Sequence, residues 1–221
     1  DENEAGKNTA RQVEEQIGTY PAEFLSNYVD AVGRRLVASH EPTPYYFRFQ
    51  VIDQAEPNAF AAPGGYIYIS RGLLALLNHE DELAAILAHE IIHVTRRHHA
   101  RQMQRGALPN VLMMPGRAVG KVVGEDVGNT INAPLEAAGN AYVSAYGRDQ
   151  ESEADRLGME LAARAGYDPA ALGPALQNLE RFVAWLSGEQ DQGGFFASHP
   201  TTPSRIADVE RLAMTIDWEP A

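Results

Sequence analysis

Two histidines four residues apart, His89 and His93, constrain this chain more than any other feature of its sequence. They enclose the run 89–93, His-Glu-Ile-Ile-His, which follows an apolar stretch at residues 83–88 in a segment typical of a helix. Residues i and i+4 of a helix lie about 40° apart on one face, so both imidazoles can reach one metal ion. Glu90, turned about 100° from His89, would flank a water on that ion.

The alternative interpretation of this run is a solvated helix face that carries two histidines and a glutamate by chance. The apolar residues before and inside the run argue against it, because they predict a partly buried helix. Imidazoles on a buried helix need partners, and a metal ion supplies one. Zinc lowers the pKa of a bound water to about 7, and a neighbouring carboxylate can then take its proton.

A catalytic zinc site needs a third protein ligand. His99 has the third-ligand spacing of the metzincin pattern H-E-x-x-H-x-x-G-x-x-H, but Arg96 stands where that pattern has glycine. Arginine favours a continuing helix over a turn with positive φ, and a continuous helix would carry His99 past the metal. We therefore expect His98 and His99 to be solvated basic residues near the end of the helix.

Glu151 is the second candidate for the third ligand. Glu151 and Asp155 are i and i+4, so they share a helix face, and Asp155 can accept the spare N–H of a ligand imidazole. Glu153 points elsewhere and is expected to be a surface charge. The alternative is that all three acids form an exposed face together with Arg148 and Arg156.

A resemblance to known proteins rests on five segments of the chain: residues 58–65, 66–74, 89–93, 151–155 and 199–206. Together they resemble a family of zinc metalloproteases that includes the CAAX prenyl protease, the heat-shock protease HtpX and the mitochondrial Oma-type stress protease. More narrowly, the chain is similar to the soluble bacterial relatives of these enzymes in the cell envelope. This resemblance implies that Glu151, rather than Glu153, is the metal ligand. It also implies protein or peptide substrates in the periplasm or cell envelope, and it allows for an envelope or membrane-associated partner.

Composition fits a compact enzyme. The chain has 221 residues, 44% of them hydrophobic, and we expect one domain over residues 1–221. A net charge of −12 argues against binding nucleic acid, which requires a basic patch. No run of about 18 apolar residues occurs, so no transmembrane segment is predicted. Cysteine is absent, which suits either cytosol or periplasm, and the start at Asp1 favours a mature or trimmed form.

Hydrophobic periodicity predicts a mainly helical α+β fold, gluzincin-like by the resemblance, with a small sheet of about three strands. The polar residues 1–19 are expected to form a loosely held helix. In residues 21–39, Phe24, Leu25, Tyr28, Val32, Leu36 and Val37 recur at helical spacing. A strand is expected over 45–52 and a hairpin over 58–70, followed by helices starting near 71 and 81 and helices over 150–165, 169–187 and 203–214.

Two segments have functional interpretations beyond architecture. Asn58, Ala59, Phe60 and Ala61 can form the strand along which an extended substrate pairs, although an ordinary core strand is the alternative. Residues 106–146 carry glycines at every fourth position from 116 to 128, a spacing that lets another backbone approach closely. We expect a plug or lid there, and chance spacing in a flexible loop is the alternative.

In the resembling enzymes a His-Pro segment, followed six residues later by an arginine, returns to the active site, and His199 and Arg205 correspond to that pair. His199 can donate a hydrogen bond to the oxyanion of the tetrahedral intermediate, or it can occupy the fourth zinc position and hold a resting enzyme inactive. The third alternative is that His199 only flanks the last helix.

The sequence thus predicts a zinc endopeptidase with one Zn²⁺ bound by His89, His93 and Glu151. Glu90 is the general base and later the proton donor, Asp155 orients a ligand, and hydrolysis proceeds without an acyl-enzyme. The competing hypothesis is a zinc-stabilised, self-inhibited, chaperone-like envelope factor with little peptidase activity. It requires four protein ligands, His199 included.

Overall fold

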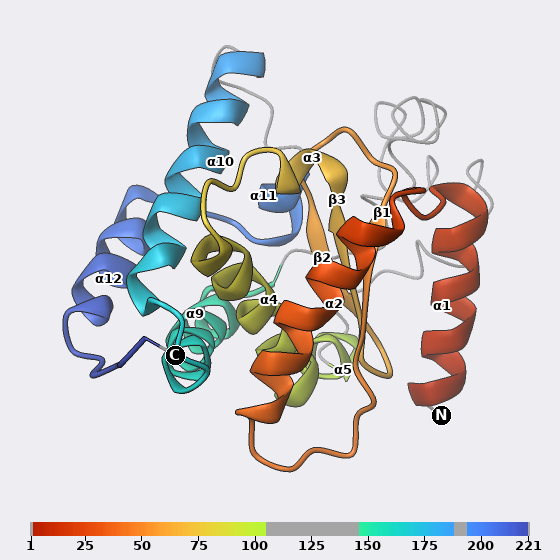
Figure 1. Cartoon of the computed structure of the whole chain (residues 1–221), viewed down its shortest axis with the longest axis horizontal. Helices are drawn as coiled ribbons and strands as arrows, with labels where there is room; N and C mark the ends of the chain where they lie inside the picture. Colours follow the sequence, from red (N-terminus) through yellow and green to blue (C-terminus); the bar gives the residue numbers. More distant parts are fainter. Residues whose placement is uncertain (1, 105–145, 188–193, 221) are drawn as a thin grey trace.

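The computed structural model describes residues 2–104, 146–187 and 194–220, and helices make up most of that part (Figure 1). The expected plug or lid at 106–146 lies outside the described residues, except for Tyr146. No helix in the described part is both long and apolar enough to cross a membrane.

A three-stranded sheet lies in the middle of the molecule, as the sequence predicts. Strands β1 (Arg48–Ile52), β2 (Ala59–Ala62) and β3 (Tyr66–Ser70) have the order β1-β3-β2. β2 and β3 form the expected antiparallel hairpin, whereas β1 runs parallel to β3. β1 begins at Arg48 rather than at residue 45. β2 is left at the edge of the sheet, next to the helices that carry the site.

Successive side chains of each strand point to opposite faces of the sheet, and helices cover both faces. Helix α1 (Glu2–Gln16) packs on one face, where Val13 contacts Phe60 and Tyr68. Helices α2 (Glu23–Ala38) and α4 (Glu80–Thr95) pack on the other face and enclose the larger core. Phe24 and Tyr28 fit the helical spacing of α2 but lie exposed, because α2 buries the side that carries Val29, Val32, Gly33 and Leu36.

Helix α4 runs through the core and is buried on every side from Glu82 to Val94. Helix α9 (Arg148–Arg164) packs along it, and no side chain separates the two helices where they are closest. A Cβ on Gly158 would lie 3.0 Å from the backbone nitrogen of His89. This close approach brings the two sequence motifs, 89–93 and 151–155, side by side.

The remaining elements surround this core, and α10 and α12 lie on the side of the molecule opposite α1 (Figure 1). Asp168 caps the 3₁₀ turn η2 by accepting from the backbone N–H of Ala170, and Thr202 caps α12 by accepting from that of Arg205. Both caps agree with the expected starts of these helices at a proline. These elements are α3 (Arg71–Leu74), α5 (His98–Gln104), η2 (Pro169–Ala171), α10 (Leu172–Ser187), α11 (Phe195–Ser198) and α12 (Pro203–Ala213).

Candidate metal centre

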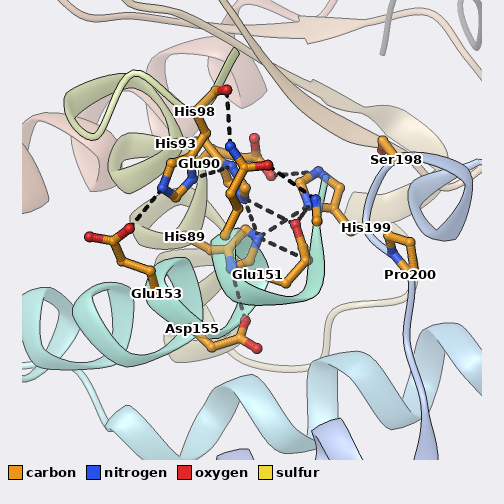
Figure 2. Close-up of polar contacts among 12 residues, drawn as sticks. His89, Glu90, His93, His98, Glu151, Glu153, Asp155, Ser198, His199 and Pro200 are labelled. Atoms are coloured by element: carbon orange, nitrogen blue, oxygen red, sulfur yellow. Dashed lines mark hydrogen bonds and ion pairs between the residues drawn. The ribbon is translucent and has the colours of Figure 1, made fainter. Parts of the chain in front are cut away.

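His89 and His93 point from one face of α4 to a common point (Figure 2). Their Nε2 atoms are 2.9 Å apart, and both side chains are buried. The Nδ1 atom of His89 lies 2.9 Å from Oδ1 of Asp155. When that nitrogen donates to the carboxylate, Nε2 keeps its lone pair and presents it to the other ligands.

Glu151 extends from α9 to the same point. Its Oε1 lies 3.3 Å from Nε2 of His93, and its Oε2 lies 3.7 Å from Nε2 of His89. Glu153, two residues later, points away from these atoms (Figure 2). The structure therefore brings together the two histidines and the carboxylate that the sequence predicts as ligands.

His199 completes a cluster of four. Its Nδ1 lies 3.2 Å from Nε2 of His89 and 3.1 Å from Oε1 of Glu151. The four ligand atoms all lie within 4.8 Å of one another. Zinc with bonds of 2.0–2.1 Å to four tetrahedral ligands would separate those ligands by about 3.4 Å, so the spacing of this cluster fits one zinc ion.

Glu90 is fully buried next to the cluster and takes no part in it. Its Oε1 lies 3.2 Å from Nε2 of His199, so this histidine faces the cluster with one ring nitrogen and the predicted base with the other. Burial raises the pKa of Glu90, although the nearby His199 and His89 oppose the rise. A buried carboxylate with a raised pKa holds a proton more readily than an exposed one.

Burial and charge act in opposite directions on the other groups. Burial would raise the pKa of Glu151, but His199, His93 and His89 hold it well below its usual range. Burial holds the pKa of His93 well below its usual range. For His199, burial lowers the pKa, but the carboxylates of Glu151 and Glu90 raise it by more than burial lowers it, so the net shift is upward.

Arg205 ties the two acidic residues of α9 together from behind the ligands. It donates from Nε and Nη2 to the two oxygens of Asp155, each at 2.8 Å, and its Nη1 lies 2.7 Å from Oε2 of Glu151. Nη1 also donates to the backbone carbonyls of His199 and Pro200. The guanidinium thus links the two carboxylates of α9 to the backbone of residues 199 and 200.

The prediction for His98 is wrong. Helix α4 stops at Thr95, Arg97 adopts a φ of 53°, and a new helix starts at His98. The side chain of His98 is buried, and its Nδ1 lies 3.0 Å from Nδ1 of His93. The sequence predicted a continuous helix because arginine rarely takes a positive φ, yet the turn occurs at an arginine.

Glu153 is also more than a surface charge. Its Oε2 lies 3.2 Å from Nε2 of His98, and Arg96 and Arg101 flank the carboxylate at 3.5 and 3.6 Å. His99, the ligand of the metzincin alternative, is not part of the four-residue cluster.

Two aromatic residues of the centre were not predicted from the sequence. The ring of Tyr146 stacks on His93 with centroids 3.8 Å apart, and the ring of Phe195 stacks on His199 at 4.4 Å. Tyr146 precedes Glu151 by five residues and Phe195 precedes His199 by four, so an aromatic residue shortly before each ligand was the available signal. Both rings restrict the orientation of the imidazoles they cover.

The residues of the centre lie within the part of the chain that matches known proteins. A model of peptidase family M48 matches residues 24–213, which include every element of the centre. The beta-barrel assembly-enhancing proteases of Yersinia pestis and of Escherichia coli K12 are each 31% identical to the chain over 86% of its length. The mitochondrial metalloendopeptidase OMA1 of Schizosaccharomyces pombe is 31% identical over 83% of the chain.

The chain spans 39% of the length of those two bacterial relatives and 51% of the fission-yeast one. The family match covers well over half of the chain, and the four-residue cluster can hold the single metal ion that such an enzyme requires. The name of the fission-yeast relative describes it as a metalloendopeptidase. The chain belongs to peptidase family M48.

Proposed function

We propose that this chain cleaves peptide bonds inside protein substrates of the bacterial cell envelope, with His89, His93 and Glu151 as its zinc ligands. The observation that carries the proposal is the convergence of these three side chains, two from α4 and one from α9, beside the buried carboxylate of Glu90. The donor set of two imidazoles and one carboxylate is typical of a catalytic zinc site.

Zinc, when bound, polarises the scissile carbonyl and lowers the pKa of water to about 7. Glu90 then acts as the general base: it takes a proton from the attacking water as the new C–O bond forms at the carbonyl carbon. Glu90 afterwards gives that proton to the amine nitrogen as the C–N bond breaks. Its burial supports this role, because a raised pKa makes the carboxylate a stronger base.

Asp155 and Arg205 prepare the ligands for this chemistry. Asp155 fixes the tautomer of His89 through the 2.9 Å contact at Nδ1. Arg205 balances the negative charge of Asp155 and Glu151, which lie one helical turn apart on α9. Without that cation, two buried carboxylates would face each other.

The edge strand β2 is the proposed docking site for the substrate backbone. The segment 58–61 consists of Asn58, which directly precedes β2, and the first three residues of β2, and the strand contacts both α4 and α11. An extended peptide can pair with a free strand edge through backbone hydrogen bonds, which hold it independently of its side chains.

The position of His199 is an argument for a resting, self-inhibited form of this enzyme. Nδ1 of His199 lies among the atoms of the three proposed ligands, and its Nε2 lies 3.2 Å from Oε1 of Glu90, which supports a form in which one imidazole covers both the metal position and the base. This arrangement also favours the second candidate function, a zinc-stabilised, chaperone-like factor with little peptidase activity. The two candidates differ in whether His199 leaves the cluster.

The envelope location and an envelope partner are proposed from the bacterial relatives, whose name refers to beta-barrel assembly. The chain corresponds to 39% of the length of each of them.

The test is casein or peptide-library cleavage by three variants, with zinc content measured on each purified protein. Glu90→Gln should keep one zinc and lose activity by about 100-fold or more, because general-base catalysis is worth that much. Glu151→Gln should lose zinc, and the control His99→Ala should keep both zinc and activity. Normal cleavage by Glu90→Gln would overturn the mechanism. Loss of zinc in His99→Ala alone would favour the metzincin arrangement.

A further inference from the structure

The break in the helix at residues 96–97 turns His98 back towards the centre. Arg97 takes the left-handed backbone conformation, a costly one for a residue other than glycine, and His98 becomes fully buried. Its ring meets that of His93 edge to face, with centroids 4.8 Å apart. A strained turn that buries a polar ring against a proposed ligand needs a compensating interaction.

The hydrogen-bond distances define that interaction atom by atom (Figure 2). Nδ1 of His98 lies 3.0 Å from Nδ1 of His93, and Nε2 of His98 lies 3.2 Å from Oε2 of Glu153. Nε2 of His93 faces Glu151 in the cluster. If that Nε2 offers a lone pair to a metal ion, the proton of His93 must sit on Nδ1.

The position of this proton then determines the positions of the others, one ring nitrogen after another. His93 donates from Nδ1 to Nδ1 of His98, which must therefore be the bare nitrogen of that ring. His98 carries its own proton on Nε2 and donates it to Glu153. The backbone carbonyl of His98 accepts from Nε2 of Gln150 at 3.1 Å, and Arg96 and Arg101 hold Glu153 from the outside.

We propose that His98 is a positioning residue for the metal centre: it links Glu153 to His93 and so fixes the tautomer and ring orientation with which His93 binds zinc. The proposal rests on the proposed role of His93 as a ligand. According to the proposal, the two ligand histidines of α4 are held by different hydrogen-bond partners. His89 is held by a carboxylate directly, through Asp155, whereas His93 is held by a carboxylate through an intervening imidazole.

The experiment measures the zinc dissociation constant by competition with a chromophoric chelator, and the melting temperature of the zinc-free protein. His98→Phe keeps a buried ring and removes both hydrogen bonds, and it should weaken zinc binding by about 10–100-fold, the usual effect of losing such a support. His98→Asn keeps an acceptor oxygen near the position of Nδ1 and should recover part of the affinity. The control His99→Phe should bind zinc like the wild type.

A merely structural role would lower the melting temperature of the zinc-free protein and leave the affinity of the folded molecules unchanged. A folded His98→Phe protein with wild-type zinc affinity overturns the proposal. If that variant does not fold, Glu153→Ala decides, since this partly exposed residue breaks the same link: weaker binding supports the proposal and wild-type affinity overturns it.

The same measurement separates this proposal from the one on which it rests. If His93→Ala binds zinc as tightly as the wild type, the assigned ligand set is wrong. If His93→Ala loses zinc and the variants at His98 and Glu153 keep it, only the positioning role fails.

Discussion

Nε2 of His199 lies 3.2 Å from Oε1 of Glu90, while Nδ1 of the same ring lies 3.2 Å from Nε2 of His89. One imidazole thus engages a proposed ligand and the proposed base together. Both groups are fully buried.

Removing His199 should therefore increase peptidase activity. His199→Ala leaves three protein ligands, enough for a catalytic zinc site, and frees Glu90. If the closed form outnumbers the open form by ten to one, the gain is about tenfold. The measurement is the initial rate of peptide cleavage at equal zinc content. A large loss of rate would instead identify His199 as the donor to the oxyanion.

Gly158 sets the distance between α9 and α4. In Gly158→Ala the new Cβ would lie 3.0 Å from the nitrogen and 3.1 Å from Cα of His89, so the helices must separate. We expect a destabilisation of about 1–3 kcal/mol and weaker zinc binding, because Glu151 and Asp155 move with α9. Urea unfolding and chelator competition measure the two effects.

The matched control is Gly173→Ala in α10, where the added Cβ would meet only Cγ of Glu210, at 3.6 Å. That contact is ordinary, and alanine favours a helix over glycine by up to about 1 kcal/mol, so this variant should be neutral or more stable. Equal stability of the two variants would contradict the tight packing of α9 on α4.

Two phenols that donate to Glu80, the first residue of α4, should make the stability of the fold fall at alkaline pH. Tyr28 and Tyr167 donate to Oε2 and Oε1 of Glu80, at 2.8 and 3.1 Å. Burial and this carboxylate raise the pKa of both tyrosines from 10.0 to about 12. The folded protein therefore holds protons that the unfolded chain has released, so their contribution is complete below pH 10 and is lost as the pH approaches 12.

Urea midpoints measured from neutral to alkaline pH test this. The double variant Tyr28→Phe, Tyr167→Phe should lose less stability than the wild type over the alkaline range. Tyr46→Phe, at a residue 63% exposed, should keep the wild-type slope. An unchanged slope in the double variant would mean that the bonds to Glu80 do not control the alkaline transition.

Local patterns were sufficient to predict the parts of the centre that lie on regular helices. The i, i+4 pairs His89–His93 and Glu151–Asp155 fix their geometry by helix periodicity alone, and the structure brings both pairs to one point. The hairpin was equally predictable, because Gly64 and Gly65 take the positive φ that its turn requires.

The rest depends on contacts between distant segments. The pairing of β1 with β3 is parallel and non-local, so no turn signal encodes it. The exposure of Phe24 depends on which side of α2 meets the sheet. The turn at Arg97 runs against the preference of its own residue type, and it places His98 between His93 and Glu153, which lie far apart in the sequence.

The contacts of Arg205 determine when this centre can assemble during synthesis. Arg205 contacts Asp155, Glu151 and the carbonyl oxygen of His199 from helix α12. A ribosome delivers the histidines of α4 more than a hundred residues before it delivers this guanidinium. A nascent chain that already displays the zinc-binding motif therefore still lacks the cation that balances the charge of its two buried acids, and the centre can assemble only after α12 has been synthesised.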